Sequence, residues 1–444
     1  MISISPEIVT VMMLGGILVG VLLGFPLALA VGGVGIVIGA VLFGPKVAQE
    51  LYYGRFFSGL ENYTLLAVPL FVFMGTMLEH SGVAEGMYDA LYLWFGGLKG
   101  GLAVTTIIIG TVLAACVGII GASVTMLALI GLPAMINRGY DRSLAAGCVC
   151  AGGSLGILIP PSIMLVVYGP MAGMSVGRLF FGAFLPGFLL SGLYIVYVLV
   201  RCAFQPHLAP PVPAADRAVP FMVKASKLLK SMVPPVVLII AVLGSIFMGI
   251  AAPTEAAAVG ALAATLLALA YRQLNWATLA RTAMTTVRVS GMVLLIGAMA
   301  FAFVGVFMRA NCDQVVSQYV LAAPGGKWGV FAIIMFICFL LGFLIDWLGI
   351  IFIMVPIVTP IAAAAGFDPL WFAMMICVNL QMSFMTPPFA YALFYVRGAA
   401  PPELGLTTGH IITGMIPYVG IIVLALALCI IFPNIILWLP SMML

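Results

Sequence analysis

The chain has 444 residues, of which 64% are hydrophobic and only 7% are charged, with 17 basic against 13 acidic side chains. Because soluble domains carry about 25% charged residues, this composition excludes a soluble enzyme and a disordered tail. Apolar runs of about 20 residues also exclude an outer-membrane β-barrel, whose strands alternate apolar and polar residues. The sequence therefore predicts an all-α polytopic membrane protein.

Apolar segments follow one another along the chain and predict its membrane helices. They cover about 8–24, 27–43, 64–79, 101–117, 145–169 and 181–203, then about 233–251, 254–271, 289–308, 330–345, 370–396 and 411–440. The stretches 118–136 and 347–363 are also apolar but are interrupted by Gly, Pro, Ser and Thr. Between the two sets lies 204–232, rich in proline and lysine, which we expect to be a basic linker between repeats 1–203 and 233–444.

Residues of rare types recur at one spacing of 227 without gaps. The matching pairs are Pro26 and Pro253, Gly33 and Gly260, Pro133 and Pro360, Tyr168 and Tyr395, Gly187 and Gly414, the triplets at 139–141 and 366–368, and the double prolines at 160–161 and 387–388. So many coincidences at a single offset, including a double proline, indicate an internal duplication.

The distribution of basic residues predicts the orientation of the two repeats. Eight of the 17 basic residues lie in 201–288, whereas the first 45 residues and those after 403 contain no lysine or arginine. By the positive-inside rule the central segment is cytoplasmic and both termini are periplasmic. Each repeat then crosses the membrane an odd number of times, so the repeats are inverted, as in many secondary transporters.

A first candidate for chemistry is 118–125, which reads Gly-Ile-Ile-Gly-Ala-Ser-Val-Thr and is followed by Gly131 and Pro133. A segment this rich in glycine and hydroxyl groups is a poor straight helix. One interpretation is a re-entrant hairpin at about 117–136 whose tip offers oxygens to a cation. The alternative is a face of small residues for helix–helix packing.

Proline pairs interrupt the next apolar segment in each half. Residues 152–162 contain Pro160-Pro161, and 379–388 contain Pro387-Pro388. Prolines remove amide donors and free carbonyls, so we expect broken helices at about 143–169 and 370–396, with a plain kink as the alternative. Paired interruptions in corresponding places are the strongest pointer to a transport site.

The second half offers further polar candidates. Asp346 begins a second hairpin expected at about 340–363, and an ionisable residue inside an apolar run suggests function, although it also suits a helix N-cap. Asn379, Gln381, Ser383 and Thr386 form the most polar cluster in any apolar segment. The alternative for this cluster is hydrogen bonding between helices.

Fixed cations are missing from these segments, because 118–136, 143–177 and 347–396 contain no Lys, Arg or His. An anionic substrate would have to be held by helix N-termini, backbone amides and co-bound cations. Hard oxygen ligands suit an alkali ion better than a transition metal, so we hypothesise bound Na⁺.

Enzyme and metal motifs are not found in the sequence. It has no H-E-x-x-H or Walker pattern. Its eight cysteines lie mostly in apolar runs and are expected to be small packing residues. We therefore expect a protein that is neither an enzyme nor an ATP-driven pump, with no nucleic-acid partner.

Several motifs together resemble the large membrane subunit of the tripartite ATP-independent periplasmic (TRAP) transporters. They are MINRGYD at 135–141, SLGILIPPS at 154–162, APTEAAA at 252–258, FDP at 367–369 and TPP at 386–388. The resemblance covers nearly the whole chain. It implies an elevator-type protein with a scaffold and a transport domain, Na⁺ coupling, and the bacterial inner membrane. It also implies two partners, a small four-helix membrane subunit and a periplasmic substrate-binding protein.

The resemblance also implies site residues. A first sodium site would draw on Gly121, Ser123, Thr125, Gly156, Ile159 and Pro161, and a second on Trp347, Ser383, Met385 and Thr386. The substrate would meet Ser123, Ser154, Asp346, Asn379, Gln381 and Pro387. The sequence departs from many members at its first tip, Gly-Ala-Ser-Val-Thr, and at Trp347, where threonine is common.

We therefore predict Na⁺-coupled import of a small organic acid, a carboxylate or sulfonate, delivered by the binding protein. One alternative is a stand-alone, ion-coupled dicarboxylate or citrate carrier that needs no binding protein. A membrane scaffold or channel, in which the paired breaks serve only packing, is the other.

Overall fold

A computed structural model describes residues 4–213, 218–387 and 390–443, and these residues are helical wherever they form regular structure. The helices of the first half are α1 (Pro6–Leu22), α2 (Leu27–Phe43), α3 (Pro45–Leu60), α4 (Ala67–Glu79), α5 (Val83–Phe95), α6 (Gly101–Val117), α7 (Ile120–Ile136), α8 (Arg142–Ser154), α9 (Ile163–Ala172) and α10 (Val176–Phe204). Those of the second half are α11 (Phe221–Phe247), α12 (Pro253–Ala270), α13 (Trp276–Arg309), α14 (Cys312–Leu321), α15 (Gly326–Leu341), α16 (Trp347–Ala364), α17 (Pro369–Met385), α18 (Tyr391–Ala399), α19 (Thr408–Ile431) and α20 (Asn434–Leu437).

The lengths of these helices confirm a polytopic helical membrane protein. Within the described ranges, six helices are long and apolar enough to cross a membrane, namely α10, α11, α12, α13, α16 and α19. A seventh span arises if α3 and the following segment Tyr63–Glu79 count as one, bent by 53°. The 17-residue helices α6, α7 and α17 are each about 25 Å long, shorter than the hydrocarbon core of about 30 Å.

Helix bounds repeat at the spacing seen in the sequence. Adding 227 to α2, α7, α9 and α10 gives 254–270, 347–363, 390–399 and 403–431, and the observed helices are α12 (Pro253–Ala270), α16 (Trp347–Ala364), α18 (Tyr391–Ala399) and α19 (Thr408–Ile431). The halves differ at one place, because α3 and α4 are bent apart while their counterpart α13 is one helix of 34 residues. The order of elements is therefore the same in both halves.

The segment expected to be a linker, 204–232, is only partly one. Helix α10 continues to Phe204 and α11 already begins at Phe221, so the connection is 205–220. Lys224, Lys227 and Lys230 lie in the first turns of α11 rather than in a loop. The reason is that Pro220 ends the irregular stretch as the N-cap, and no helix breaker follows it before the apolar part of the helix.

Both predicted hairpins begin earlier than expected. The range 117–136 contains essentially one helix, α7, and the other arm is α6, joined to it by a turn at 118–119. Likewise 340–363 is mostly α16, and its partner arm is α15. The first arms are uninterrupted apolar helices, which the sequence cannot distinguish from full spans.

Near each proline pair the structure has one helix ending and another beginning. Helix α8 ends at Ser154, a short 3-10 turn covers Leu155–Ile157, and α9 restarts at Ile163. Helix α17 ends at Met385 and α18 restarts at Tyr391. Pro388 lies outside the described residues. The halves interlock reciprocally, because hairpin arm α16 packs on α9 of the other half and α7 packs on α18.

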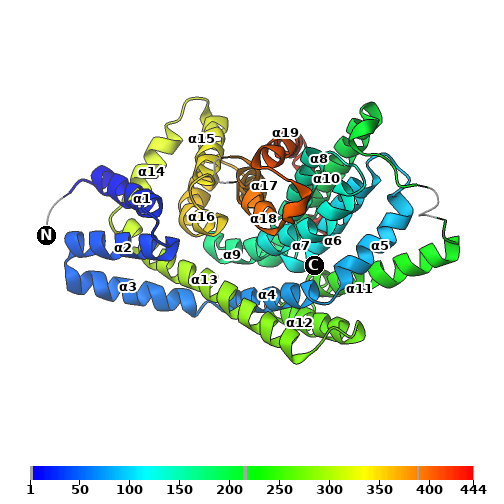
Figure 1. Cartoon of the computed structure of the whole chain (residues 1–444). Helices are drawn as coiled ribbons and strands as arrows, with labels where there is room; N and C mark the ends of the chain where they lie inside the picture. Colours follow the sequence, from blue (N-terminus) through cyan, green and yellow to red (C-terminus); the bar gives the residue numbers. More distant parts are fainter. Residues whose placement is uncertain (1–3, 214–217, 388–389, 444) are drawn as a thin grey trace.

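Figure 1 shows two groups of helices, which we call the outer helices and the central bundle. The outer helices are α1–α5 and α11–α14; α2, α3 and α4 pack along the long α13, and α12 packs on α4. The central bundle consists of the two hairpins, the two broken helices, α10 and α19. Its tightest contact joins α8 to α19, where a methyl group added at Gly147 would lie 2.2 Å from the carbonyl oxygen of Gly414.

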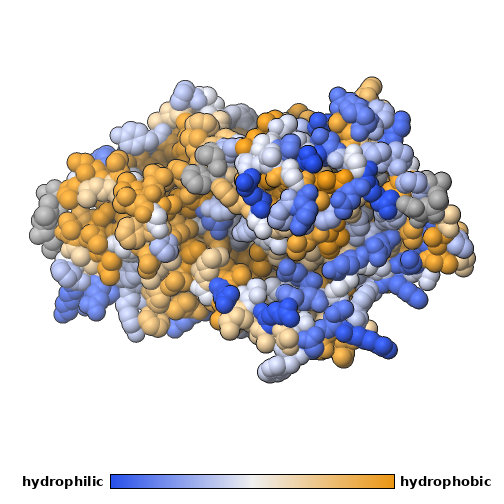
Figure 2. All heavy atoms as spheres, viewed as in Figure 1, coloured by the Kyte–Doolittle hydropathy of each residue, from blue (hydrophilic) through white to orange (hydrophobic). Residues whose placement is uncertain are grey.

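Much of the outer surface is apolar, as a bilayer requires. Figure 2 shows a broad hydrophobic area over the end of the molecule that contains α1 and α2. Exposed side chains there include Ile8, Val11, Val19, Leu29 and Val37, each more than half exposed. Their exposure is explained by contact with lipid or with another membrane subunit.

Candidate binding site at the helix breaks

A cavity of about 260 Å³ lies where the two hairpin tips meet the broken helices. The first tip contributes Ile119, Ile120 and Gly121, and the second contributes Asp346, Trp347 and Leu348. Helices α9, α13, α17 and α18 complete the wall with Ile163, Val289, Met292, Val293, Phe384, Tyr391 and Tyr395. The walls around this cavity, as described, contain no lysine, arginine or histidine.

Four helices begin at this cavity. Ile120, Ile163, Trp347 and Tyr391 are the first residues of α7, α9, α16 and α18, and all four line it. The first amides of a helix have no partner within the helix, and its dipole places about half a positive charge at that end. Four such ends around one space attract an anion without any basic side chain.

Ser123 lies beside the first helix break. Its side chain is fully buried, and its hydroxyl finds no hydrogen-bond partner among the described residues. A methyl group added at Gly156 would lie 3.1 Å from Ser123 Oγ and 3.8 Å from the carbonyl oxygen of Ile119. The structure therefore brings together the tip of the first hairpin and the turn after α8, with an unpaired oxygen between them.

Backbone carbonyl oxygens also lie close to the first hairpin tip and its break. A methyl group added at Gly118, where φ is +65°, would lie 3.3 Å from the carbonyl oxygen of Pro161. The Ser162 hydroxyl donates a hydrogen bond to the carbonyl of Ile157, which satisfies one carbonyl released by the break. The Ile159 side chain points elsewhere, because it packs against Gly187 of α10. Only its backbone could serve an ion.

Thr125 does not join Ser123. Helix α7 is regular over both residues, so Thr125 points about 200° away from Ser123 around the helix axis. It shares its side of α7 with Gly121, one turn earlier. Gly121 lines the cavity and touches α18, since a methyl group there would lie 2.9 Å from the Tyr395 ring.

At the second helix break, polar side chains occupy positions where the first break has glycine. Ser383 lies against Gly342 at the end of α15, and its hydroxyl donates to the carbonyl of Phe339 at 3.4 Å. Thr386 donates to Met382 at 2.7 Å within its own turn. Trp347 is half-buried and lines the cavity, whereas Pro387 is exposed and does not.

Polar residues at the middle of α17 differ sharply in how they are satisfied. Asn379 donates to the carbonyl of Met335 in α15 at 2.8 Å, as expected for interhelical bonding. Gln381 is fully buried, and neither its amide nitrogen nor its oxygen has a partner within the described parts of the chain. Burying an unpaired amide costs about 1–3 kcal/mol, so packing within the described chain does not account for this side chain.

The two breaks touch each other through Ser154 and Met385. Ser154 Oγ donates to the carbonyl of Ala151 at 2.9 Å and lies 3.6 Å from Met385 Sδ. Neither residue lines the cavity. The structure thus separates the predicted substrate residues: Asp346 lies at the cavity, whereas Ser123, Ser154, Asn379 and Gln381 lie in the packed layer around it.

Sequence analysis missed part of the cavity wall. Tyr391 and Tyr395 line it from α18, and Val289, Met292 and Val293 line it from α13. Nothing marks the α13 residues in the sequence, because they are ordinary apolar positions of a long helix. The tyrosines did carry a signal, since Tyr395 matches Tyr168 at the spacing of 227.

Helical hairpins and broken helices around one cavity are typical of membrane transport proteins. The solved structure of the YdaH transporter from Alcanivorax borkumensis aligns with a TM-score of 0.63 at 16% identity, covering 90% of both chains. The antimetabolite efflux pump MtrF from Neisseria gonorrhoeae aligns with a TM-score of 0.53 at 15% identity, covering 90% of this chain and 85% of that one.

Residues 10–435 match the family described as "Tripartite ATP-independent periplasmic transporter, DctM component", and the chain belongs to this family. The C4-dicarboxylate TRAP transporter large permease proteins of Pseudomonas aeruginosa and Vibrio cholerae are 30% and 31% identical to it. The alignments cover 90% of this chain in both cases, and 91% and 89% of those proteins. The ectoine TRAP transporter large permease of Halomonas elongata is 27% identical over 95% of this chain and 96% of its own.

Proposed function

We propose that this TRAP large permease imports a small organic acid, a carboxylate or sulfonate, by coupling to Na⁺, and that a periplasmic binding protein delivers the substrate. The single observation that carries the proposal is the joining of hairpin tip and helix break around the unpaired Ser123 hydroxyl. On this proposal the protein is not an enzyme, because its work is translocation.

Sodium fits the first break better than other ions. A hard oxygen set, formed by the Ser123 hydroxyl and the carbonyls of Ile119 and Pro161, suits an alkali cation. In the described part of the chain no group of three His, Cys, Asp or Glu could hold a metal ion. The second ion would lie near Trp347 and Ser383, by the repeat, with Met385 or Thr386 as a further ligand.

The substrate's acidic group is assigned to the cavity at the four helix N-termini. These ends supply the attraction that arginine supplies in other anion sites, and bound Na⁺ would strengthen it. A site of this kind releases its anion more readily than a bidentate arginine site, because it forms no charged fork. Such release suits a carrier.

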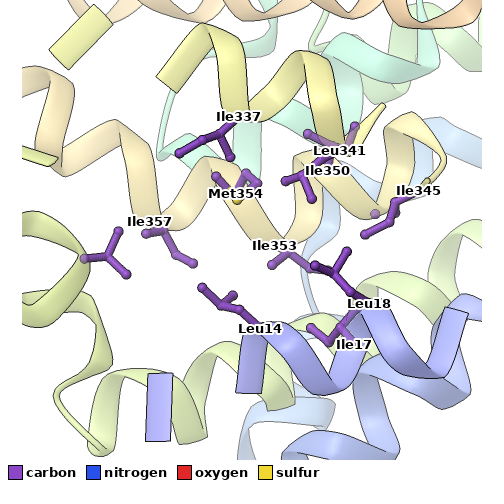
Figure 3. Close-up of a pocket in the computed structure, with 12 residues that line it drawn as sticks. Leu14, Ile17, Leu18, Ile337, Leu341, Ile345, Ile350, Ile353, Met354 and Ile357 are labelled. Carbon is purple, nitrogen blue, oxygen red and sulfur yellow. The ribbon is translucent and has the colours of Figure 1, made fainter. Parts of the chain in front are cut away.

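Movement is proposed to follow an elevator scheme, with the outer helices as scaffold and the central bundle as transport domain. A second cavity, of about 230 Å³, lies between α1 and α14 on one side and the hairpin α15–α16 on the other. Figure 3 shows its lining of aliphatic side chains, among them Leu14 and Ile17 facing Ile353 and Met354. A boundary without directional bonds allows the two groups to slide.

The proposal includes two partners, a small four-helix membrane subunit and a periplasmic substrate-binding protein. The exposed apolar side chains of α11 and α12, such as Ile240, Leu262 and Leu266, offer a surface for a small four-helix membrane subunit. We place the chain in the bacterial inner membrane with both termini periplasmic and the repeats inverted.

The test is uptake into proteoliposomes that contain this chain with the small subunit and binding protein encoded beside it. We expect labelled substrate to accumulate on an inward Na⁺ gradient and not when K⁺ replaces Na⁺ at equal ionic strength. Equal uptake in K⁺ contradicts the coupling. Uptake that persists at full rate without the binding protein favours the stand-alone carrier instead.

A further inference from the structure

Besides Phe384, three aromatic rings and one carboxylate line the cavity at the hairpin tips. Trp347, Tyr391 and Tyr395 line it together with Asp346, and the rest of the wall is apolar apart from Gly121. Asp346 and both tyrosines line the same cavity, so its carboxylate and their rings border one space. Such a cavity is unusual for a ligand that is only an anion, because the fixed negative charge of Asp346 would repel it.

The carboxylate is not explained by helix capping alone. Asp346 is the N-cap of α16 and makes no cap hydrogen bond of standard geometry, although the amides of Trp347 and Leu348 lie close to it. By contrast, Asp141 caps α8 with a bond of 2.9 Å and Asp368 caps α17 with one of 2.8 Å. The Asp346 carboxylate therefore lines the cavity with weaker capping than these two residues show.

We propose that the transported solute is a zwitterion, in which a quaternary ammonium or similarly diffuse cation lies against Asp346 and the three rings while the carboxylate lies at the helix N-termini. Electron-rich rings attract such cations, and a neighbouring carboxylate adds to the attraction. This inference rests on the proposed function and narrows its substrate class.

The alternative for the rings is simple packing, and it accounts for only part of the wall. Phe384 and Tyr391 do pack, with ring centroids 6.1 Å apart. Trp347 is only half-buried, however, and Tyr395 is 40% exposed. Rings left partly open toward a cavity remain available to a ligand.

Size is consistent with a small solute. A cavity of about 260 Å³ is below the usual range of about 300–1,000 Å³ for drug-sized ligands. Ser290 of α13, one residue from Val289, is buried with an unpartnered hydroxyl in the described structure, so one more polar group stands next to this wall. A compact zwitterion with one polar and one methylated end fits these walls better than a dicarboxylate.

The test uses a pair of probes that differ in charge alone. Glycine betaine and 3,3-dimethylbutyrate have the same shape, but only the first carries a cationic centre. Binding of each to the purified full chain is measured in saturating Na⁺ by the rise in unfolding temperature. We expect betaine to bind about tenfold more tightly, the size of a good cation–π contact.

Two variants link that preference to the wall. Asp346→Asn and Trp347→Leu should each abolish it, and Trp347→Phe should keep part of it. The proposal is overturned if the two probes bind equally, if 3,3-dimethylbutyrate binds more tightly, or if neither probe binds. It is also overturned if the preference for betaine is unchanged in Asp346→Asn. Succinate binding is measured in the same assay with and without Na⁺. If it depends on Na⁺, the proposed Na⁺-coupled organic-acid function stands even when the zwitterion proposal fails.

Discussion

The two halves build the same frame of helices and equip it differently. Around the first break the decisive positions are Gly118, Gly156 and Ser123, so backbone carbonyls and one small hydroxyl face each other. Around the second, Asp346 and Gln381 supply larger polar side chains. On our proposal the first half binds an ion and the second recognises the solute.

The largest effect is expected at the unpaired hydroxyl of the first half. Ser123→Ala removes an oxygen with no protein partner, so we expect the Na⁺ concentration for half-maximal stabilisation to rise about 30-fold, or about 2 kcal/mol. Ser383→Ala, whose hydroxyl already bonds Phe339, should raise it by only about threefold.

Thermal unfolding against NaCl, with KCl at matched ionic strength, measures both variants. Ser245→Ala serves as the control, because its hydroxyl bonds Val242 away from the site. If Ser123→Ala and Ser383→Ala raise the Na⁺ concentration for half-maximal stabilisation equally, the two halves do not differ as we propose.

A second contrast lies within α17, where two amides differ in pairing. Asn379→Leu leaves the Met335 carbonyl without its donor and should destabilise the chain by about 1 kcal/mol. Gln381→Leu removes an unpaired buried amide and should stabilise it by a similar amount, while uptake falls. Unfolding temperature and uptake are measured on the same preparations. Destabilisation by Gln381→Leu would mean that its amide already has a partner.

Gly121 tests how closely the first tip approaches the second half. A methyl group there would meet the Tyr395 ring at 2.9 Å, so Gly121→Ala should displace that ring and weaken solute binding by about threefold. The double variant Gly121→Ala with Tyr395→Ala should show less than the sum of the two single effects. Solute binding is measured by ligand-induced thermal shifts. If the two single effects add strictly in the double variant, the Tyr395 ring does not contact Gly121.

The smallest effect is expected at Thr125. Its side chain lies on the other side of α7 from Ser123, so Thr125→Ala should change Na⁺ affinity by less than about twofold. Sodium titration of this variant beside Ser123→Ala gives the comparison. If Thr125→Ala weakens Na⁺ binding as much as Ser123→Ala does, Thr125 belongs to the ion site after all.

Much of the frame could be read from the sequence because it depends on local signals. Proline pairs mark both breaks, and the offset of 227 gives the helix bounds of one half from the other. Helices α6 and α15 could not be paired with α7 and α16 from the sequence, since a hairpin arm and a full span have the same apolar composition.

The site was only partly predictable for a different reason. Ser123 and Asp346 stand out as polar residues in apolar surroundings, but which side of a helix they face depends on its register. Thr125 and Ser123 seemed equivalent in sequence and are separated by helix geometry. The α13 residues Val289 and Val293 carry no local signal, because they reach the cavity through packing between distant segments.

The most direct measurement is equilibrium binding of radioactive sodium to the purified wild-type chain and to Gly156→Ala. The added methyl group would lie 3.1 Å from Ser123 Oγ and fill the space between the first hairpin and its break. The account predicts saturable binding that Na⁺ displaces and K⁺ does not, with one component lost in a folded Gly156→Ala protein. No saturable binding, or unchanged binding in Gly156→Ala, would contradict it.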